Sequence, residues 1–186
     1  MQNTKKGFTL IELLIVIGIL AILVAAVVVV LNPAQLLAQA RDGQRMSDMD
    51  SIRSAINLDL ATVSGATLTA TTTVTASTTG ALQPSGWTAV INASTAVNGT
   101  GWVNVDLTQI SGGSPLSRLP IDPTNSGAYY YGFKTNSATS TYKIIARLES
   151  TKYQTKMTSD GGTLNTCSNY TEATCFYEIG SDVTGI

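Results

Sequence analysis

A single carboxylate interrupts a long apolar stretch near the start of the chain. From Phe8 to Leu31 the residues are apolar except at Thr9, Glu12 and Gly18. A carboxylate in a bilayer costs on the order of several kcal/mol, so such a residue usually has a partner or a function. No Lys or Arg lies within this stretch. We therefore single out Glu12 as a functional residue; the alternative is a surface glutamate that reaches the membrane boundary.

Residues for enzymatic chemistry are sparse. The 186 residues contain no histidine, which removes the commonest general base and the commonest metal ligand. A Gly-rich phosphate loop and a nucleophile motif are also absent. We therefore predict that the chain is not an enzyme. Only 12% of residues are charged and the net charge is −1, so no specific nucleic-acid site is expected.

The apolar stretch is long enough to cross a membrane. At about 1.5 Å per residue, a helix over residues 13–31 nearly spans the ~30 Å hydrocarbon core. Lys5 and Lys6 precede it, which predicts a single pass with the N-terminus in the cytoplasm and the rest of the chain outside. The alternatives are a secretory signal cleaved near Ala25-Ala26 and a plain signal anchor, which leaves Glu12 unexplained.

Residues 32–60 form a second helical stretch that begins near Pro33. Its apolar residues recur at spacings of three or four: Leu36, Leu37, Ala40, Met49, Ile52, Ile56 and Leu60. Charges of alternating sign lie between them: Arg41, Asp42, Arg45, Asp48, Asp50 and Arg53. This pattern predicts an amphipathic helix with a solvated charged face and an apolar stripe that packs on its own domain.

Residues 61–186 have the composition of a β-rich domain. Candidate strands are 87–91, 101–106, 128–133, 142–148 and 176–179, and residues 71–75 could be a strand or a loop. Tyr142, Ile144, Ala146 and Leu148 alternate with Lys143 and Arg147, which predicts one buried and one exposed face. We expect a 128–148 hairpin within a small antiparallel sheet of three or four strands, packed on the long helix. The predicted class is α+β.

Two cysteines lie close together in the last third of the chain. The spacing of Cys167 and Cys175 is not a zinc pattern. Both fall on the predicted external side, where disulfides persist, and closing so short a loop would stabilise by roughly 2–3 kcal/mol. We predict a Cys167–Cys175 disulfide, with two free buried thiols as the alternative.

The N-terminal residues resemble a known processing site. Lys5-Lys6-Gly7-Phe8-Thr9-Leu10-Ile11-Glu12-Leu13-Leu14 is similar to the site in type IV prepilins and type II secretion pseudopilins. The resemblance implies that a membrane peptidase cuts between Gly7 and Phe8 and methylates the new N-terminus. It implies a pilin-like fold with a leader at 1–7, a transmembrane and filament-core helix at 8–31, an amphipathic helix at 32–60 and an extracytoplasmic domain at 61–186.

The resemblance also implies a function and partners. Glu12 corresponds to the glutamate of the filament core, where it would pair with the amino group of Phe8 in the same or a neighbouring subunit. The expected partners are further copies of the chain, the prepilin peptidase/methyltransferase, an inner-membrane assembly platform and membrane lipid before assembly. The expected location is the cytoplasmic membrane, then an extracellular or periplasmic filament.

Several interpretations of the whole chain stay open. The first is a subunit of a type IV pilus or pilus-like filament. The second is a pseudopilin of a type II secretion or DNA-uptake system, and the third is a membrane-anchored binding module. No cofactor is expected. Major pseudopilins bind calcium near the C-terminus, but we interpret the acids there as scattered and solvated: Asp160, Glu172, Glu178 and Asp182.

Overall fold

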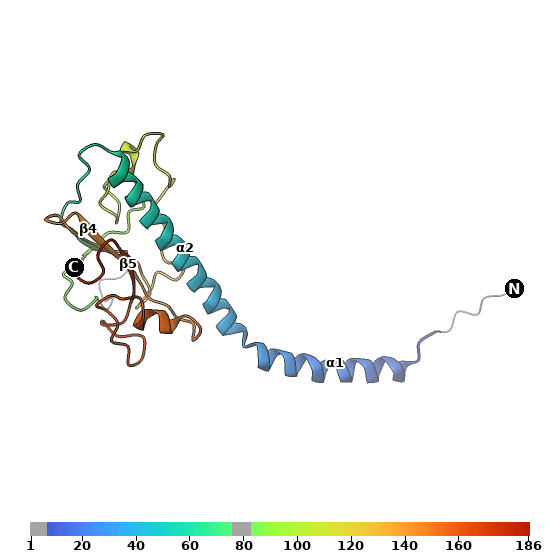
Figure 1. Cartoon of the computed structure of the whole chain (residues 1–186). Coiled ribbons are helices and arrows are strands. Elements are labelled where there is room, and N and C mark those ends of the chain that lie inside the picture. Colours follow the sequence, from blue (N-terminus) through green and yellow to red (C-terminus); the bar gives the residue numbers. More distant parts are fainter. Residues whose placement is uncertain (1–6, 76–82) are drawn as a thin grey trace. The chain divides into compact units, whose positions relative to one another are not determined.

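The structure is a computed structural model of the chain that describes residues 7–75 and 83–186. Its chain contacts divide it into two compact units, Met1–Leu37 and Ala38–Ile186. Figure 1 shows the elements, which in chain order are α1 (Leu10–Leu31), α2 (Pro33–Thr62), β1 (Thr72–Val74), β2 (Val90–Ile91), the 3-10 helix η1 (Leu107–Gln109), β3 (Gly132–Asn136), β4 (Thr141–Ala146), the 3-10 helix η2 (Gln154–Thr158) and β5 (Tyr177–Gly180).

The expected long helix is divided at Asn32. This residue ends α1 in the left-handed region, with φ of 41° and ψ of 77°, which asparagine tolerates better than most residues. Pro33 then starts α2, because proline disfavours α geometry in the residue before it but suits a first helical position. The carbonyl of Asn32 accepts from the amide of Gln35 at 2.9 Å. One residue thus ends the first helix and caps the second.

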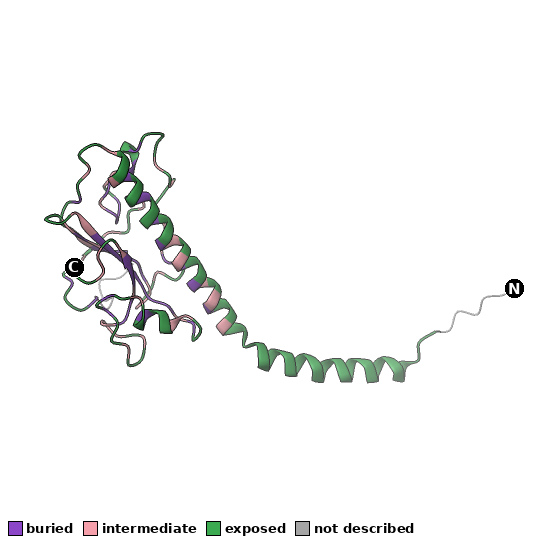
Figure 2. Ribbon diagram, viewed as in Figure 1, coloured by how far each residue is buried: buried purple, intermediate pink, exposed green. Residues whose placement is uncertain are grey.

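One face of α2 is buried, although it is not the purely apolar stripe that we predicted. Figure 2 shows the buried positions on one side of this helix. They recur every three or four residues and include three charged side chains: Ala38, Asp42, Arg45, Met49, Ile52, Ala55, Ile56 and Asp59. The prediction that Asp42 and Arg45 are solvated is therefore wrong. Leu36, Leu37 and Ala40 of the predicted stripe are exposed instead.

The sheet has five strands in the order β2-β1-β3-β4-β5. β3 and β4 form the predicted hairpin, with Phe133 opposite Ile144, and β1 and β5 pair antiparallel on either side of it. β2 adds to β1 in parallel, so the sheet is larger than predicted and mixed. A long N-terminal apolar helix with this small sheet confirms the α+β, pilin-like class.

Apolar clusters cover both faces of the sheet, whereas the sequence predicted one buried and one exposed face. The first apolar cluster joins α2 to one face through Ile52, Ile56, Phe133 and Ile144. The second covers the opposite face: Val74, Trp87, Tyr130, Ile145, Leu164 and Phe176. The predicted exposure of Lys143 and Arg147 is accordingly wrong, because both are fully buried on this second face.

Three predicted strands differ from the structure. Of the strand predicted at 87–91, only Val90–Ile91 pairs, as β2. Residues 101–106 form no strand, and Trp102, Val103 and Val105 are all buried in the core rather than alternating. A Cβ on Gly101 would lie 2.0 Å from the carbonyl oxygen of Ala96, so the segment packs directly against residue 96, and its one β-type pairing is an isolated bridge between Asn98 and Asp106. The predicted strand at 128–133 begins later, at Gly132, because residues 126–129 make a tight turn.

Candidate functional site

The proposed cleavage junction lies just outside a helix. Gly7, Phe8 and Thr9 precede α1, and Thr9 is extended, with φ of −81° and ψ of 151°. The side chain of Phe8 is 87% exposed. The Gly7–Phe8 peptide bond is therefore accessible in an irregular segment, where no helical hydrogen bonds protect it. Lys5 and Lys6, to which the sequence assigned the leader charge, lie outside the described residues.

Thr9 and Glu12 form a reciprocal cap at the start of α1. The hydroxyl of Thr9 accepts from the amide of Glu12 at 3.3 Å. In return, Oε2 of Glu12 accepts from both the amide and the hydroxyl of Thr9 at 2.8 Å. This capping box satisfies amides that a helix start otherwise leaves unpaired. Glu12 therefore has a partner within its own helix before any processing.

This partner was absent from the prediction, which considered only the amino group of Phe8. The signal was present, because Thr-x-x-Glu before an apolar run is the pattern of a capping box. Thr9 is thus a site residue that the sequence analysis missed. The hydroxyl of Thr9 holds the Glu12 carboxylate at the helix start. Thr9 directly follows Phe8, the residue on which cleavage would create the new amino group.

The helix that follows exposes an apolar surface along its whole length. No residue of α1 is buried by the described part of the chain, as Figure 2 shows. Among residues 7–75 and 83–186, it is the one helix long and apolar enough to cross a membrane. Water would hydrate this surface at a large cost in free energy, so lipid or other apolar helices must cover it.

Comparison with known proteins identifies this N-terminal arrangement. Residues 2–28 match the family model described as the prokaryotic N-terminal methylation motif. The chain carries the prepilin-type signature of type IV pilins and pseudopilins. The match covers Gly7 and Phe8, the Thr9–Glu12 cap and most of α1. Comparisons with curated proteins and with solved structures give no match to this chain.

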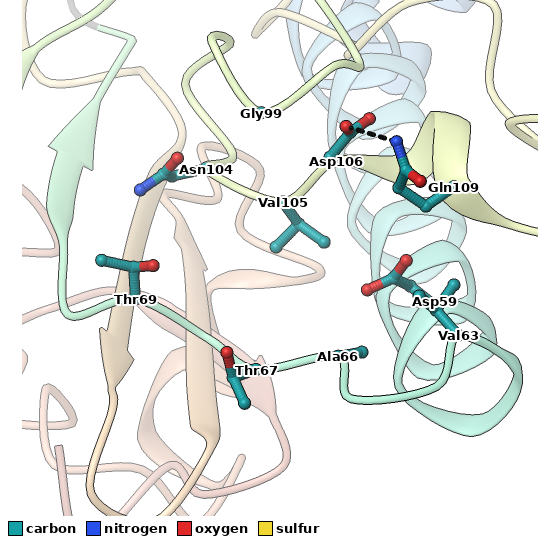
Figure 3. Close-up of a pocket in the computed structure, with 10 residues that line it drawn as sticks. All are labelled: Asp59, Val63, Ala66, Thr67, Thr69, Gly99, Asn104, Val105, Asp106 and Gln109. Atoms are coloured by element: carbon teal, nitrogen blue, oxygen red, sulfur yellow. Dashed lines mark hydrogen bonds between the residues drawn. The ribbon is translucent and has the colours of Figure 1, made fainter.

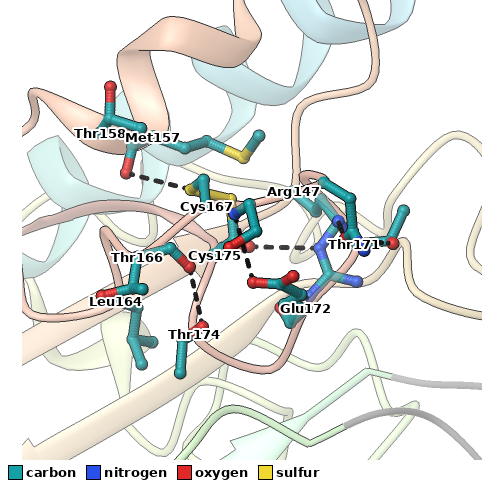
Figure 4. The surroundings of a disulfide bond; sticks show 12 residues. Arg147, Met157, Thr158, Leu164, Thr166, Cys167, Thr171, Glu172, Thr174 and Cys175 are labelled. Atoms are coloured by element: carbon teal, nitrogen blue, oxygen red, sulfur yellow. Dashed lines mark hydrogen bonds between the residues drawn. A yellow bond between two sulfur atoms is a disulfide. The ribbon is translucent and has the colours of Figure 1, made fainter.

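The second compact unit, Ala38–Ile186, which we call the globular unit, contains a disulfide close to a buried arginine. Cys167 is bonded to Cys175, and Figure 4 shows Arg147 beside the loop that the bond closes. Nη2 of Arg147 donates to the carbonyl of Glu172 at 2.5 Å, and its Nε donates to the carbonyl of Cys175 at 3.2 Å. The guanidinium also lies 4.2 Å from the ring centre of Phe176. Arg147, the residue directly after β4, thus attaches the disulfide loop to the end of that strand.

A buried ion network fastens α2 to two loops of the globular unit. Arg45 forms ion pairs with Asp42 at 2.8 Å, Asp122 at 2.7 Å and Glu149 at 2.6 Å. Arg41 adds a second contact to Glu149. Burial alone would lower the pKa of Arg45, but the three carboxylates outweigh it and raise that pKa. The guanidinium therefore stays charged, and it links residues that are far apart in the chain.

The C-terminal acids are less solvated than predicted. Glu178 is buried, and its Oε1 lies 2.8 Å from Nζ of Lys143, which is also buried. Its Oε2 accepts from the amide of Leu164, and Asp160 accepts from the amide of Glu178. These contacts stabilise the second face of the sheet. No group of three His, Cys, Asp or Glu side chains suited to a metal occurs in residues 7–75 and 83–186.

Proposed function

We propose that the chain is a structural subunit of a type IV pilus or a related pilus-like filament. The observation that carries the proposal is an apolar helix, α1, in which no residue is buried by the described part of the chain and whose first turn carries a capped glutamate, four residues after Phe8. The match over residues 2–28 supports processing at that junction. A prepilin peptidase then cuts between Gly7 and Phe8 and methylates Phe8.

The exposed helix serves two states in turn. In the cytoplasmic membrane, lipid covers α1, with the N-terminus on the cytoplasmic side and the globular unit outside. In the filament, the α1 helices of neighbouring copies cover one another. Because apolar surface stays out of water in both states, the transfer yields little net hydrophobic free energy. An assembly platform in the inner membrane supplies the driving force.

Glu12 supplies the specificity of assembly. Its carboxylate carries a charge that Thr9 stabilises only through neutral hydrogen-bond donors. After cleavage, the amino group of a neighbouring Phe8 offers a full opposite charge within the apolar filament core. A charged pair in that environment is more favourable than a lone carboxylate in lipid and sets the register between subunits.

Two measurements on the native organism test this function. Mass spectrometry of the mature protein should give Phe8 as its N-terminal residue, carrying one methyl group. Mechanical shearing of cells should release filaments that contain this chain. An intact Met1, or cleavage near Ala25-Ala26, contradicts the processing step. A correctly processed chain that never leaves the membrane fraction contradicts the filament.

A further inference from the structure

Arg147 is a buried cation without a carboxylate partner. Its side chain is fully buried, and Nη1 has no hydrogen-bond partner in the described part of the chain. All 12 Asp and Glu residues lie in residues 7–75 and 83–186, yet no ion pair within these ranges includes Arg147. Burial lowers the pKa of Arg147, but an arginine stays charged in proteins. Neutral groups alone therefore stabilise this charge.

These neutral groups come from one short segment at the end of the disulfide loop. The carbonyls of Glu172 and Cys175 accept from the guanidinium, which also faces the ring of Phe176. The carbonyl of Glu172 accepts in addition from the amide of Cys175 at 3.1 Å, which closes a turn. Figure 4 shows Glu172 and Cys175 beside the guanidinium. Residues 172–176 thus form a cover over the charge.

The Cys167–Cys175 bond keeps this cover in place. Cys175 is fully buried, and Cys167 packs in the same apolar cluster as Met157 of η2, so the bond ties the cover to that helix. Two hydrogen bonds between Thr166 and Thr174 also hold the loop. They are weaker supports, because Thr166 is exposed and water competes for its hydrogen bonds.

An acid elsewhere in the globular unit shows the contrast. Asp59 takes part in none of the ion pairs of the described residues, but it lines a surface pocket of about 280 Å³ at the end of α2 (Figure 3). Water in that pocket can hydrate its carboxylate. Nη1 of Arg147 is closed off from solvent instead. Hydration of the guanidinium therefore requires residues 172–176 to move.

We propose that Arg147 and the disulfide loop form a redox-sensitive latch. A buried charge that only neutral groups stabilise keeps a desolvation cost, and hydration removes that cost. In the oxidised chain, the Cys167–Cys175 bond opposes the opening that would hydrate the guanidinium. A dithiol reductant supplies two electrons and two protons, breaks the Sγ–Sγ bond to give two thiols, and becomes a disulfide itself. The guanidinium then moves into water, and residues 172–176 open with it.

The latch links the closed form of the globular unit to an oxidising environment. Disulfides persist outside the cytoplasm and are reduced within it. A reduced chain therefore has an open segment at residues 172–176 and an accessible Cys175 thiol, whereas oxidation closes both. All groups of the latch belong to the globular unit, so the inference does not depend on the proposed filament.

The test measures local opening by amide hydrogen exchange in the full chain, purified oxidised in detergent. Reduction with dithiothreitol should raise the exchange rate of residues 172–176 by about tenfold or more, because these amides then exchange through local opening. The amides of β3 should keep their protection. Unchanged exchange at residues 172–176 after reduction overturns the proposal. Loss of protection in β3 at the same time also overturns it, because the reduced unit then unfolds as a whole.

Neutral variants isolate the role of the guanidinium. In Arg147→Met, which has no charge to hydrate, reduction should leave exchange at residues 172–176 near the oxidised rate. Arg53→Met removes an exposed arginine and should open on reduction like the wild type. Arg147→Gln, which keeps a donor for one carbonyl, takes the place of Arg147→Met if the latter does not fold. Equal opening in the wild type and in the neutral variant contradicts the latch.

Discussion

Arg45 and Asp122 form a two-pronged ion pair in which both side chains are completely buried. Nε of Arg45 donates to Oδ2 of Asp122 at 2.7 Å, and Nη2 donates to Oδ1 at 3.0 Å. Asp122 also accepts from the amides of Thr124 and Asn125, so it fixes the loop that leads toward β3. The pair therefore connects the conformation of this loop to a single side chain of α2.

Removing Arg45 should destabilise the globular unit strongly. Arg45→Met fills similar space but leaves Asp42 and Asp122 as buried carboxylates without a counter-charge, which costs about 3–5 kcal/mol. The free energy of unfolding can be measured in urea through the fluorescence of the two buried tryptophans, Trp87 and Trp102. Arg53→Met removes an exposed ion pair with Asp50 and serves as the control, with an expected loss below about 1 kcal/mol. Equal losses in the two variants would contradict a special role for the buried network.

Acid should weaken the same network through Glu149. Burial tends to raise the pKa of Glu149, but its contacts with Arg41 and Arg45 lower the pKa below the ordinary value of 4.5. A carboxyl group whose folded pKa is depressed stabilises the fold above that ordinary value, and this stability is lost as pH falls through the folded pKa. Unfolding in urea between pH 6 and 3 should therefore show a decline below about pH 4.5. Glu149→Gln should be less stable at pH 6 and should decline less steeply, and parallel curves would count against this assignment.

Substitutions of Glu12 should leave membrane insertion and leader cleavage intact but impair filament assembly, and substitutions of Thr9 should test the cap at the start of α1. Glu12→Val should keep membrane insertion and leader cleavage but impair assembly, while Glu12→Gln, which keeps hydrogen bonding without the charge, should be partly defective. Thr9→Val removes the hydroxyl of the cap, whereas Thr9→Ser keeps it, so only the valine variant should loosen the helix start. The measurements are sheared filament per cell and the processed pool in the membrane. Normal filament yield from Glu12→Val would show that the carboxylate has no role in assembly.

The disulfide should stabilise the globular unit by a moderate amount. Replacing Cys167 and Cys175 together by serine opens a loop whose ends are separated by 8 positions in the sequence, which should lower the free energy of unfolding by roughly 2–3 kcal/mol. Mass mapping without reductant should recover the two cysteines in one linked peptide. Reduction of the wild type should reproduce the loss seen in the double variant. Alkylation of both thiols in untreated protein would contradict the bond.

The sequence predicted those parts of the fold in which local pattern and burial agree. The alternation of Tyr142, Ile144 and Ala146 with polar residues predicted the hairpin. The apolar helix was predicted because an apolar run of that length must be covered by lipid or by other helices. The same reasoning failed for Lys143 and Arg147, because charged side chains signal solvent unless a partner is known. Glu178 and the carbonyls of the disulfide loop provide those partners, and they lie about 30 residues further along the chain.

The candidate site residues also differ in how far the sequence could predict them. The junction at Gly7–Phe8 and the acid Glu12 follow from short-range spacing, and the Thr9 cap could have been found from that spacing. Arg45 was misplaced on the solvated face because its charge gave no indication that Asp122 and Glu149 meet it from other segments.

The strand order also determines when the globular unit can finish folding. The central hairpin of β3 and β4 is local, but β5 at residues 177–180 forms one edge of the sheet and carries Glu178, the partner of Lys143. If the globular unit is exported as we propose, the hairpin would emerge before β5, with Lys143 still lacking its partner Glu178 and one sheet edge open. Closure of the sheet would then await the arrival of residue 180 on the far side of the membrane. In the proposed topology, α1 would hold the unfinished chain at the bilayer until the last strand arrives.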